Sequence, residues 1–231
     1  MARLSRLALA GHTHHVMQRA LDPLVLFEDE ADYRFMHQLL VEQGREQQVA
    51  LHAYVLMPDR FHLLLTPASD EGLARLMQGL GRRYVRYRNA RAARAGTLWE
   101  GRYRGAPLQP EAWLVPCMAF LDLAPVRAGL VELAADWAWS SHRHYVGLDN
   151  DRAVTPHALH WTLGNTPFAR EHAYARRTQA GLSPAELSAL VDSAQHGWPL
   201  GDASFRTALE QRSGRRTERG KPGRPRRAAP D

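Results

Sequence analysis

The chain has 231 residues, of which 45% are hydrophobic, so it can bury a substantial core. A single cysteine, Cys117, excludes an internal disulfide and favours a reducing compartment. The apolar run near the N-terminus ends at Gly11, too early for the core of a signal peptide, and no later segment is long enough to span a membrane. We therefore expect a cytoplasmic protein with no membrane partner.

Positive charge is unevenly distributed along the chain. The formal net charge is +6, and residues 212–231 alone contain eight basic and two acidic residues. A second stretch, residues 75–94, contains seven arginines and no acidic residue. Arginine-rich segments of this kind favour contact with nucleic acid phosphates, and a solvated helix face is the alternative interpretation of residues 75–94.

The first part of the sequence predicts short strands alternating with amphipathic helices. Residues 13–19 and 22–27 are candidate strands on either side of a turn. Asp29 or Asp32 can cap a helix that reaches about Gly44, because apolar residues then recur on one face. This order predicts an α+β sandwich. The next predicted elements are a strand over residues 49–57, its antiparallel partner over 61–65, and helices over 73–87 and 113–123.

Beyond about residue 150 the pattern becomes helical. Ser183 and Glu186 have the spacing of a capping box, and Gly197 can end the helix that follows. A shorter helix is predicted over residues 202–211. We expect three parts: a domain over residues 1–150, a helical extension over 151–211, and a basic tail over 212–231 that is disordered when unbound.

Four segments carry motifs whose order along the chain is informative. They are MPDRFHLLL (residues 57–65), LWEGRYR (98–104), APVRAGLV (124–131) and WSSHRHYVG (139–147). Together they resemble the REP-associated branch of the single-tyrosine HUH transposases. The resemblance covers about residues 10–147 and implies a ferredoxin-like antiparallel sheet with helices on one face.

The resemblance also implies where a catalytic site would lie. In that family two histidines and a third side chain hold a divalent cation, and a tyrosine attacks a DNA phosphate. The matching positions here are Arg60, His62, Phe120 and Ala124. Residues 60 and 62 point to the same side of a strand, and residues 120 and 124 are one helical turn apart, so the four can meet.

The side chains at these positions cannot perform that reaction. Arg60 has no lone pair for a metal, Phe120 lacks a nucleophilic oxygen, and Ala124 supplies no ligand. His62 alone makes a poor site for a divalent cation. We therefore expect no intact catalytic residue and no resident cofactor, with Mg²⁺ or Mn²⁺ required only if some activity remains.

Two ways of recovering function at this site stay open. Substitute residues could rebuild catalysis, and the candidates are Tyr54, Tyr103, Tyr145, His52 and His144. His52, on the neighbouring strand, could approach His62. Alternatively, the guanidinium of Arg60 could hold a DNA phosphate where the metal would lie, so that a cation replaces a cation. The plain alternative is a solvated Arg60.

Basic residues outside this site predict DNA contacts. The arginines after residue 81 are interleaved with Tyr84 and Tyr87, which either stack on bases or belong to the core. We expect Trp99 to be structural. Residues 220–227 resemble an AT-hook, although Pro222 stands where a basic residue is usual. The predicted DNA-binding residues are Arg60, Arg82, Arg83, Arg86, Arg88, Arg102, Arg104, Lys221, Arg224, Arg226 and Arg227.

The function that the sequence favours is binding of single-stranded or hairpin DNA, without strand cleavage, by a transposase-like protein located on the bacterial nucleoid. An active transposase that carries out DNA transposition with substitute residues is the alternative. An RNA-binding regulator is a further one, since ferredoxin-like sheets also present aromatic residues to bases. The oligomeric state is left open by the sequence.

Overall fold

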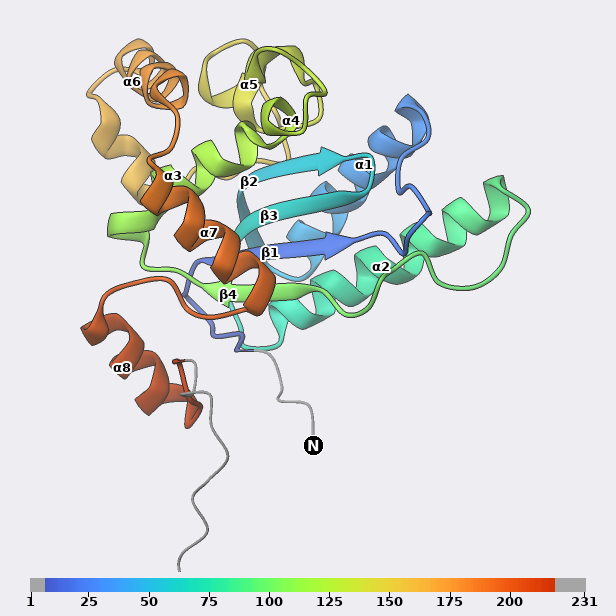
Figure 1. The fold of residues 1–231 in the computed structure, drawn as a ribbon, viewed down its shortest axis with the longest axis horizontal. Coiled ribbons are helices and arrows are strands. Elements are labelled where there is room, and N and C mark those ends of the chain that lie inside the picture. Colours follow the sequence, from blue (N-terminus) through green and yellow to red (C-terminus); the bar gives the residue numbers. More distant parts are fainter. Residues whose placement is uncertain (1–6, 219–231) are drawn as a thin grey trace, which may run out of the picture.

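A four-stranded antiparallel sheet forms the centre of the computed structural model, which describes residues 7–218 (Figure 1). The strands follow the order β2-β3-β1-β4, and two helices, α1 and α2, alternate with them along the chain. This is the ferredoxin-like topology, so the predicted fold class is confirmed. The bounds are β1 (His14–Arg19), α1 (Glu30–Glu46), β2 (Val49–Met57), β3 (Arg60–Pro67), α2 (Gly72–Arg91) and β4 (Arg104–Pro107).

The start of α1 is fixed by a side-chain cap. Asp29 is the N-cap, because its carboxylate accepts a hydrogen bond from the backbone N–H of Asp32 at 3.2 Å. Asp32, the other predicted cap, lies inside the first turn and is fully buried. Of the two predicted starts, the earlier one is therefore confirmed.

One predicted strand is wrong, and one strand was not predicted. Residues 22–27 form a turn and an irregular segment, whose Leu26 N–H donates to the carbonyl of Pro58 at 2.7 Å. The fourth strand is instead β4, which pairs with β1 through Val16 opposite Gly105. Four residues that include a glycine and a proline carry no hydrophobic alternation, so the sequence gives no signal for this edge strand.

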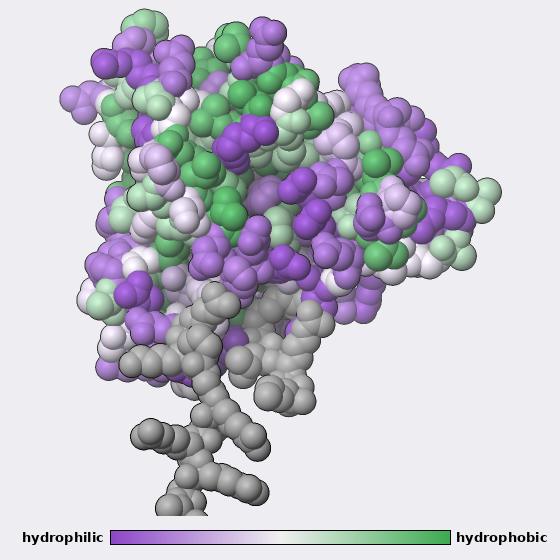
Figure 2. Space-filling view, viewed as in Figure 1, coloured by the Kyte–Doolittle hydropathy of each residue, from purple (hydrophilic) through white to green (hydrophobic). Residues whose placement is uncertain are grey.

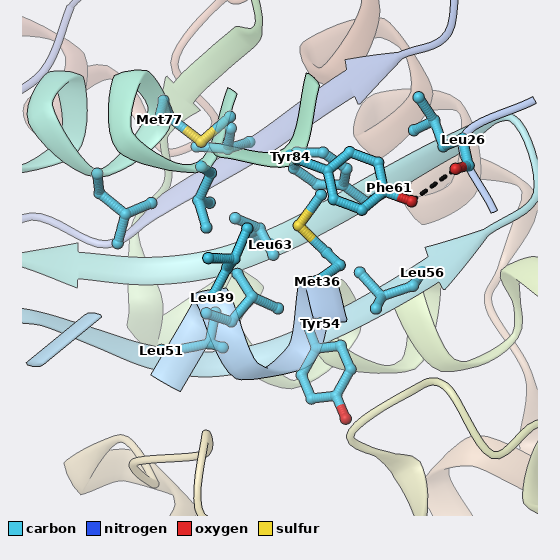
Figure 3. Close-up of a cluster of buried hydrophobic side chains, with 14 of the residues drawn as sticks. Leu26, Met36, Leu39, Leu51, Tyr54, Leu56, Phe61, Leu63, Met77 and Tyr84 are labelled. Atoms are coloured by element: carbon cyan, nitrogen blue, oxygen red, sulfur yellow. Dashed lines mark hydrogen bonds between the residues drawn. The ribbon is translucent and has the colours of Figure 1, made fainter. Parts of the chain in front are cut away.

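One face of the sheet packs against α1 and α2 to form the first core (Figure 3). Phe61, Leu63 and Leu65 alternate along β3 and point into it, and all three are buried. The hydroxyl of Tyr84, on α2, donates to the carbonyl of Leu26 at 2.6 Å. This face is structural throughout.

The opposite face of the sheet, which the predicted arrangement left open, is also covered by helices. Here α3 (Pro110–Asp122) and α7 (Pro184–His196) pack on the strands. Both strand faces are apolar near the middle of the sheet, which suits burial on two sides. The remaining helices are α4 (Ala124–Arg127), η1 (Ala134–Asp136), α5 (His142–Tyr145), η2 (Ala158–Leu163), α6 (Pro167–Ala180) and α8 (Ala203–Ser213).

A buried carboxylate joins the extension to α3. Asp122, the last residue of α3, accepts a hydrogen bond from the Tyr174 hydroxyl of α6 at 2.6 Å. The same oxygen lies 3.0 Å from Nδ1 of His142, on α5. Three elements that are far apart in the sequence are therefore held at one buried point.

The C-terminal helix signals are confirmed. Ser183 and Glu186 form the predicted capping box, with the Ser183 hydroxyl accepting from the Glu186 N–H at 3.2 Å. Gly197 ends α7 in the left-handed conformation, at φ 73°. The AT-hook-like segment, with Lys221, Arg224, Arg226 and Arg227, lies outside the described residues. Within residues 7–218, no helix has both the length and the hydropathy to cross a membrane.

Candidate functional site

The four positions singled out by the motifs line one pocket of about 280 Å³. Arg60 and His62 come from β3, Phe120 from the end of α3, and Ala124 from the start of α4. The spacing argument therefore placed these residues correctly relative to one another. The α7 helix of the extension, which lies over the sheet in Figure 1, also lines this pocket.

A second histidine, which the sequence analysis did not select, lies beside His62. Nε2 of His15 on β1 is 3.0 Å from Nδ1 of His62, and the two rings stack with centroids 5.2 Å apart. Burial lowers the pKa of His15 to about 4. Burial is the main cause that holds the pKa of His62 well below its usual range, and the guanidinium groups of Arg60 and Arg127 act in the same direction. Both imidazoles are therefore neutral at pH 7, one donating and one accepting.

The ring of Phe120 occupies the space next to this pair. It stands edge-on to His15 at 5.7 Å and to His62 at 5.9 Å between centroids. It is buried, with only 5% of its surface exposed. The ring completes the packing of the site but carries no oxygen, so this position supplies no nucleophile.

Arg127 is the second residue that the sequence analysis missed. Its guanidinium carbon lies 4.4 Å from the centre of the Phe120 ring, and its Nη2 donates to the Phe120 carbonyl at 2.6 Å. Burial lowers the pKa of Arg127 to about 10, and within residues 7–218 it has no acidic partner. Helical spacing from Phe120 and Ala124 would have indicated it, since residues 120, 124 and 127 share one side of the helical path.

Arg60, in contrast, already has a carboxylate partner. Its Nε and Nη2 atoms lie 2.9 and 2.8 Å from the two carboxylate oxygens of Asp59. A bidentate pair of this kind compensates the charge locally. Arg127 is therefore the cation at this pocket whose charge is uncompensated by the residues that the structure describes.

The histidines proposed as substitute ligands lie elsewhere. In the part of the chain that is described, no three His, Cys, Asp or Glu side chains come together as a metal site. His52 sits at a bulge of β2, and its ring nitrogens contact the Thr155 carbonyl at 2.7 Å and the Thr66 hydroxyl at 2.8 Å. The expectation that His52 approaches His62 is therefore wrong. His144 accepts a hydrogen bond from the backbone N–H of Asp151.

Two of the three substitute tyrosines are engaged in the interior. The Tyr54 hydroxyl donates to Asp151 at 2.6 Å, and the Tyr145 hydroxyl donates to the His52 carbonyl at 2.5 Å. Burial raises the pKa of both phenols above the usual range. Neither lines the pocket of His62, whereas Tyr103 lines two neighbouring pockets.

The predicted DNA-binding arginines of α2 divide into two groups. Arg88 is 3% exposed, and its Nη1 lies 3.1 Å from the buried carboxylate of Asp32. A buried counterion of this kind cannot reach DNA, so the prediction for Arg88 is wrong. Arg83 is exposed but paired with Glu42 at 2.6 Å. Tyr84 and Tyr87 belong to the core or its margin, where Tyr87 stacks on Phe35.

Three other predicted arginines border a groove beside α2. Arg82, Arg86 and Arg102 line this groove of about 1230 Å³ together with Trp99. Within the described residues these three arginines have no ion-pair partner. Trp99 packs edge-on against the buried Phe61, with 6.1 Å between centroids, in keeping with a structural role.

Comparison with known proteins identifies the fold. No protein-family model matches the chain, and no curated protein matches it in sequence. The structure is similar to that of a REP-associated tyrosine transposase bound to a REP hairpin, with a TM-score of 0.54 and 16% identity, covering 66% of this chain and 90% of that chain. A candidate transposase from Deinococcus radiodurans R1 gives a TM-score of 0.36 at 20% identity, covering 48% of this chain and 88% of the other. The chain thus has the fold of the REP-associated tyrosine transposase, as the motifs predicted.

Proposed function

We propose that this chain binds single-stranded or hairpin DNA and does not cut it. The observation that carries the proposal is the composition of the pocket at the four motif positions. A neutral histidine pair, a phenylalanine ring and an unpaired arginine meet there, in place of a metal site and a tyrosine. That set can hold a phosphate, but it offers no nucleophile and no cluster of metal ligands.

DNA binding is supported by fold and by charge together. The similar solved structure is that of a transposase bound to a REP hairpin. In this chain Arg82, Arg86 and Arg102 border one continuous groove and have no acidic partner among the described residues. Uncompensated guanidinium groups along a groove suit a phosphate backbone, because each phosphate contact releases bound counterions.

Both faces of the sheet are covered by helices, which weakens the RNA-binding alternative. Bases stack on sheet aromatics only where strands are open to solvent. Here α1 and α2 cover one face, and α3 and α7 cover the other (Figure 1). We therefore expect DNA of a given hairpin sequence to bind at least as tightly as the RNA.

The test is incubation of the chain with a labelled DNA hairpin, with and without Mn²⁺ or Mg²⁺. We expect a shifted band on a native gel, no covalent band on a denaturing protein gel, and no effect of a chelator on the shift. A covalent protein–DNA band would contradict the proposal, and Tyr103→Phe would then show whether that tyrosine is the nucleophile. Absence of any shift would contradict DNA binding, and a stronger shift with RNA would favour the regulator.

A further inference from the structure

A third pocket lies where the C-terminal segment meets the edge of the sheet. It has a volume of about 440 Å³ and is built from β1, β4, the end of α7 and the residues that follow α8. Part of it therefore belongs to the extension beyond residue 150. Its basic residues are Arg19, Arg102, Arg104, Arg215 and Arg216, and Glu100 is the acidic residue in its lining.

The charges in this pocket are poorly compensated. Glu100 lies 3.7 Å from Arg19 and can offset one of the five guanidinium groups. Arg102, Arg104 and Arg216 are exposed, with no ion-pair partner in the described part of the chain. Like charges that line one pocket raise the free energy of the folded protein, and an anion bound among them would lower it.

Arg215 adds a more specific indication. Its Nε and Nη1 atoms are enclosed but have no hydrogen-bond partner within residues 7–218. Enclosed donors without a partner are costly, so an anion that accepts hydrogen bonds from them would bind favourably here. Burial lowers the pKa of Arg215, which is the direction expected for a cation without a counterion.

An indole completes the pocket. Gly197 ends α7 so close to β4 that a Cβ added there would lie 3.4 Å from the Gly105 carbonyl. This close approach brings Trp198 to the pocket, where its carbonyl accepts from the Ser193 hydroxyl at 2.8 Å. Trp198 is half-buried, and its ring makes no contact with another ring among the described residues. A partly exposed indole among arginines is a platform on which a base can stack.

The position of the pocket connects it with the rest of the site. It shares Met17 with the pocket of His62 and Arg127, and it shares Gln18 and Arg102 with the groove along α2. The three hollows therefore follow one another across β1. Figure 2 shows this face of the molecule, with apolar residues gathered over the region of α4 and α7 and hydrophilic residues beside them along the β4 edge.

We propose that this pocket binds an unpaired nucleotide of a DNA strand, with its base on Trp198 and its phosphates on Arg104, Arg215 and Arg216. This assignment rests on the DNA-binding function proposed above, and it places an unpaired part of the DNA in the pocket beside Trp198. A volume of about 440 Å³ suits a ligand the size of a nucleotide, and it is small for a base pair with two backbones.

The first test compares a blunt DNA hairpin with the same hairpin carrying a short thymidine flank, at either end. We expect the flank to increase the affinity of the unaltered chain roughly tenfold, because stacking on an aromatic side chain contributes about 1–3 kcal/mol per base. Trp198→Ala should remove most of that gain. Trp198→Phe should retain much of it. Trp161→Ala is the matched control, because Trp161 is 53% exposed in a different pocket and should bind as the unaltered chain does.

The second test addresses the phosphates. The double variant Arg215→Gln/Arg216→Gln should lower the salt dependence of binding by about one to two units for the flanked hairpin only. The control is Arg152→Gln/Arg176→Gln, two exposed arginines outside this pocket. We expect its salt dependence to match that of the unaltered chain.

Two results would overturn the nucleotide pocket while leaving DNA binding intact. One is a flank that adds no affinity. The other is an equal loss for blunt and flanked hairpins in Trp198→Ala, which would assign the indole to packing. If the unaltered chain shifts neither hairpin, the proposed function fails as well, and the two failures are thereby distinguished.

Discussion

The two faces of the central sheet use the same strands for different purposes. On β3, Phe61, Leu63 and Leu65 face α1 and α2, while Arg60 and His62 face α3 and α7. The first face is apolar and closely packed. The second carries a buried histidine pair, a cation over an aromatic ring and an open pocket. Period-two alternation thus lets one strand serve as core and as site.

The contrast separates what the fold requires from what the chemistry requires. The apolar face forms the core beneath α1 and α2. On the other face the four motif positions converge on one pocket, and three of them, Arg60, Phe120 and Ala124, carry neither a metal-ligating atom nor a nucleophilic oxygen. Packing constraints and catalytic constraints act on alternate residues of one strand, so the second set can change without loss of the first.

The largest effect on stability should come from the buried cation of α2. Arg88→Met leaves the fully buried Asp32 with one cation fewer, and breaking a buried pair costs about 3–5 kcal/mol of unfolding free energy. Arg86→Met, two residues earlier and exposed, should change stability by less than about 0.5 kcal/mol but weaken DNA binding. Urea denaturation and gel shifts measure both. Similar stability losses would mean that the two arginines are not functionally separate.

The next prediction compares the loss of stability caused by one substitution on each face of the sheet. Leu63→Ala, in the first core, should lower the unfolding free energy by about 2–5 kcal/mol, because it leaves a cavity. Phe120→Tyr should change it by less than about 1.5 kcal/mol, since the ring borders a pocket of about 280 Å³ that can receive a hydroxyl. Denaturant unfolding of both variants tests this. A large loss in Phe120→Tyr would show that the second face is as tightly packed as the first.

The histidine pair predicts a pH dependence of stability. The folded chain keeps His15 neutral with a pKa of about 4, whereas the unfolded chain protonates it near its ordinary value of about 6.5. The contribution of His15 is therefore complete above pH 6.5 and is lost as the pH falls toward 4, by roughly 3 kcal/mol. His15→Gln should show a shallower loss between these pH values in urea denaturation. The exposed His172→Gln should follow the unaltered chain, and an unchanged slope in His15→Gln would refute the prediction.

The smallest expected effect is a difference in the salt dependence of DNA binding between variants of Arg127 and Arg60, the two arginines in the pocket of His62. Arg127→Gln should lower the salt dependence of hairpin binding by about one unit, the loss of one phosphate contact. Arg60→Gln should lower it less, because Asp59 already compensates that charge. Titrations at several salt concentrations measure both slopes. The reverse order would restore the hypothesis that Arg60 takes the place of the metal.

Spacing rules predicted the convergence of the site, because alternation on a strand and the turn of a helix are local. They placed Arg60 with His62 and Phe120 with Ala124 without any knowledge of the sheet. Partners across the sheet are not local. His15 reaches His62 only through the pairing of β1 with β3, which the sequence does not specify.

The arginines of α2 show a second limit of prediction from the sequence. Arg82, Arg86 and Arg88 look alike in a count of charges, yet only Arg88 is buried. It lies four residues after Tyr84, on the apolar stripe of the helix, so helical spacing would have indicated its burial. The sequence of the short β4 strand, in contrast, shows no alternation that would have indicated a strand.

The carboxylate of Asp122 has a practical consequence for anyone who shortens this chain. Asp122 lies two residues after Phe120, and one of its hydrogen bonds comes from Tyr174, within the extension. A fragment that ends at residue 150 would leave a charged group in apolar surroundings with one partner fewer, and it would uncover the sheet face beneath α7. The smallest fragment suited to binding studies therefore extends past α8 to Arg216, which also keeps Trp198 and Arg215.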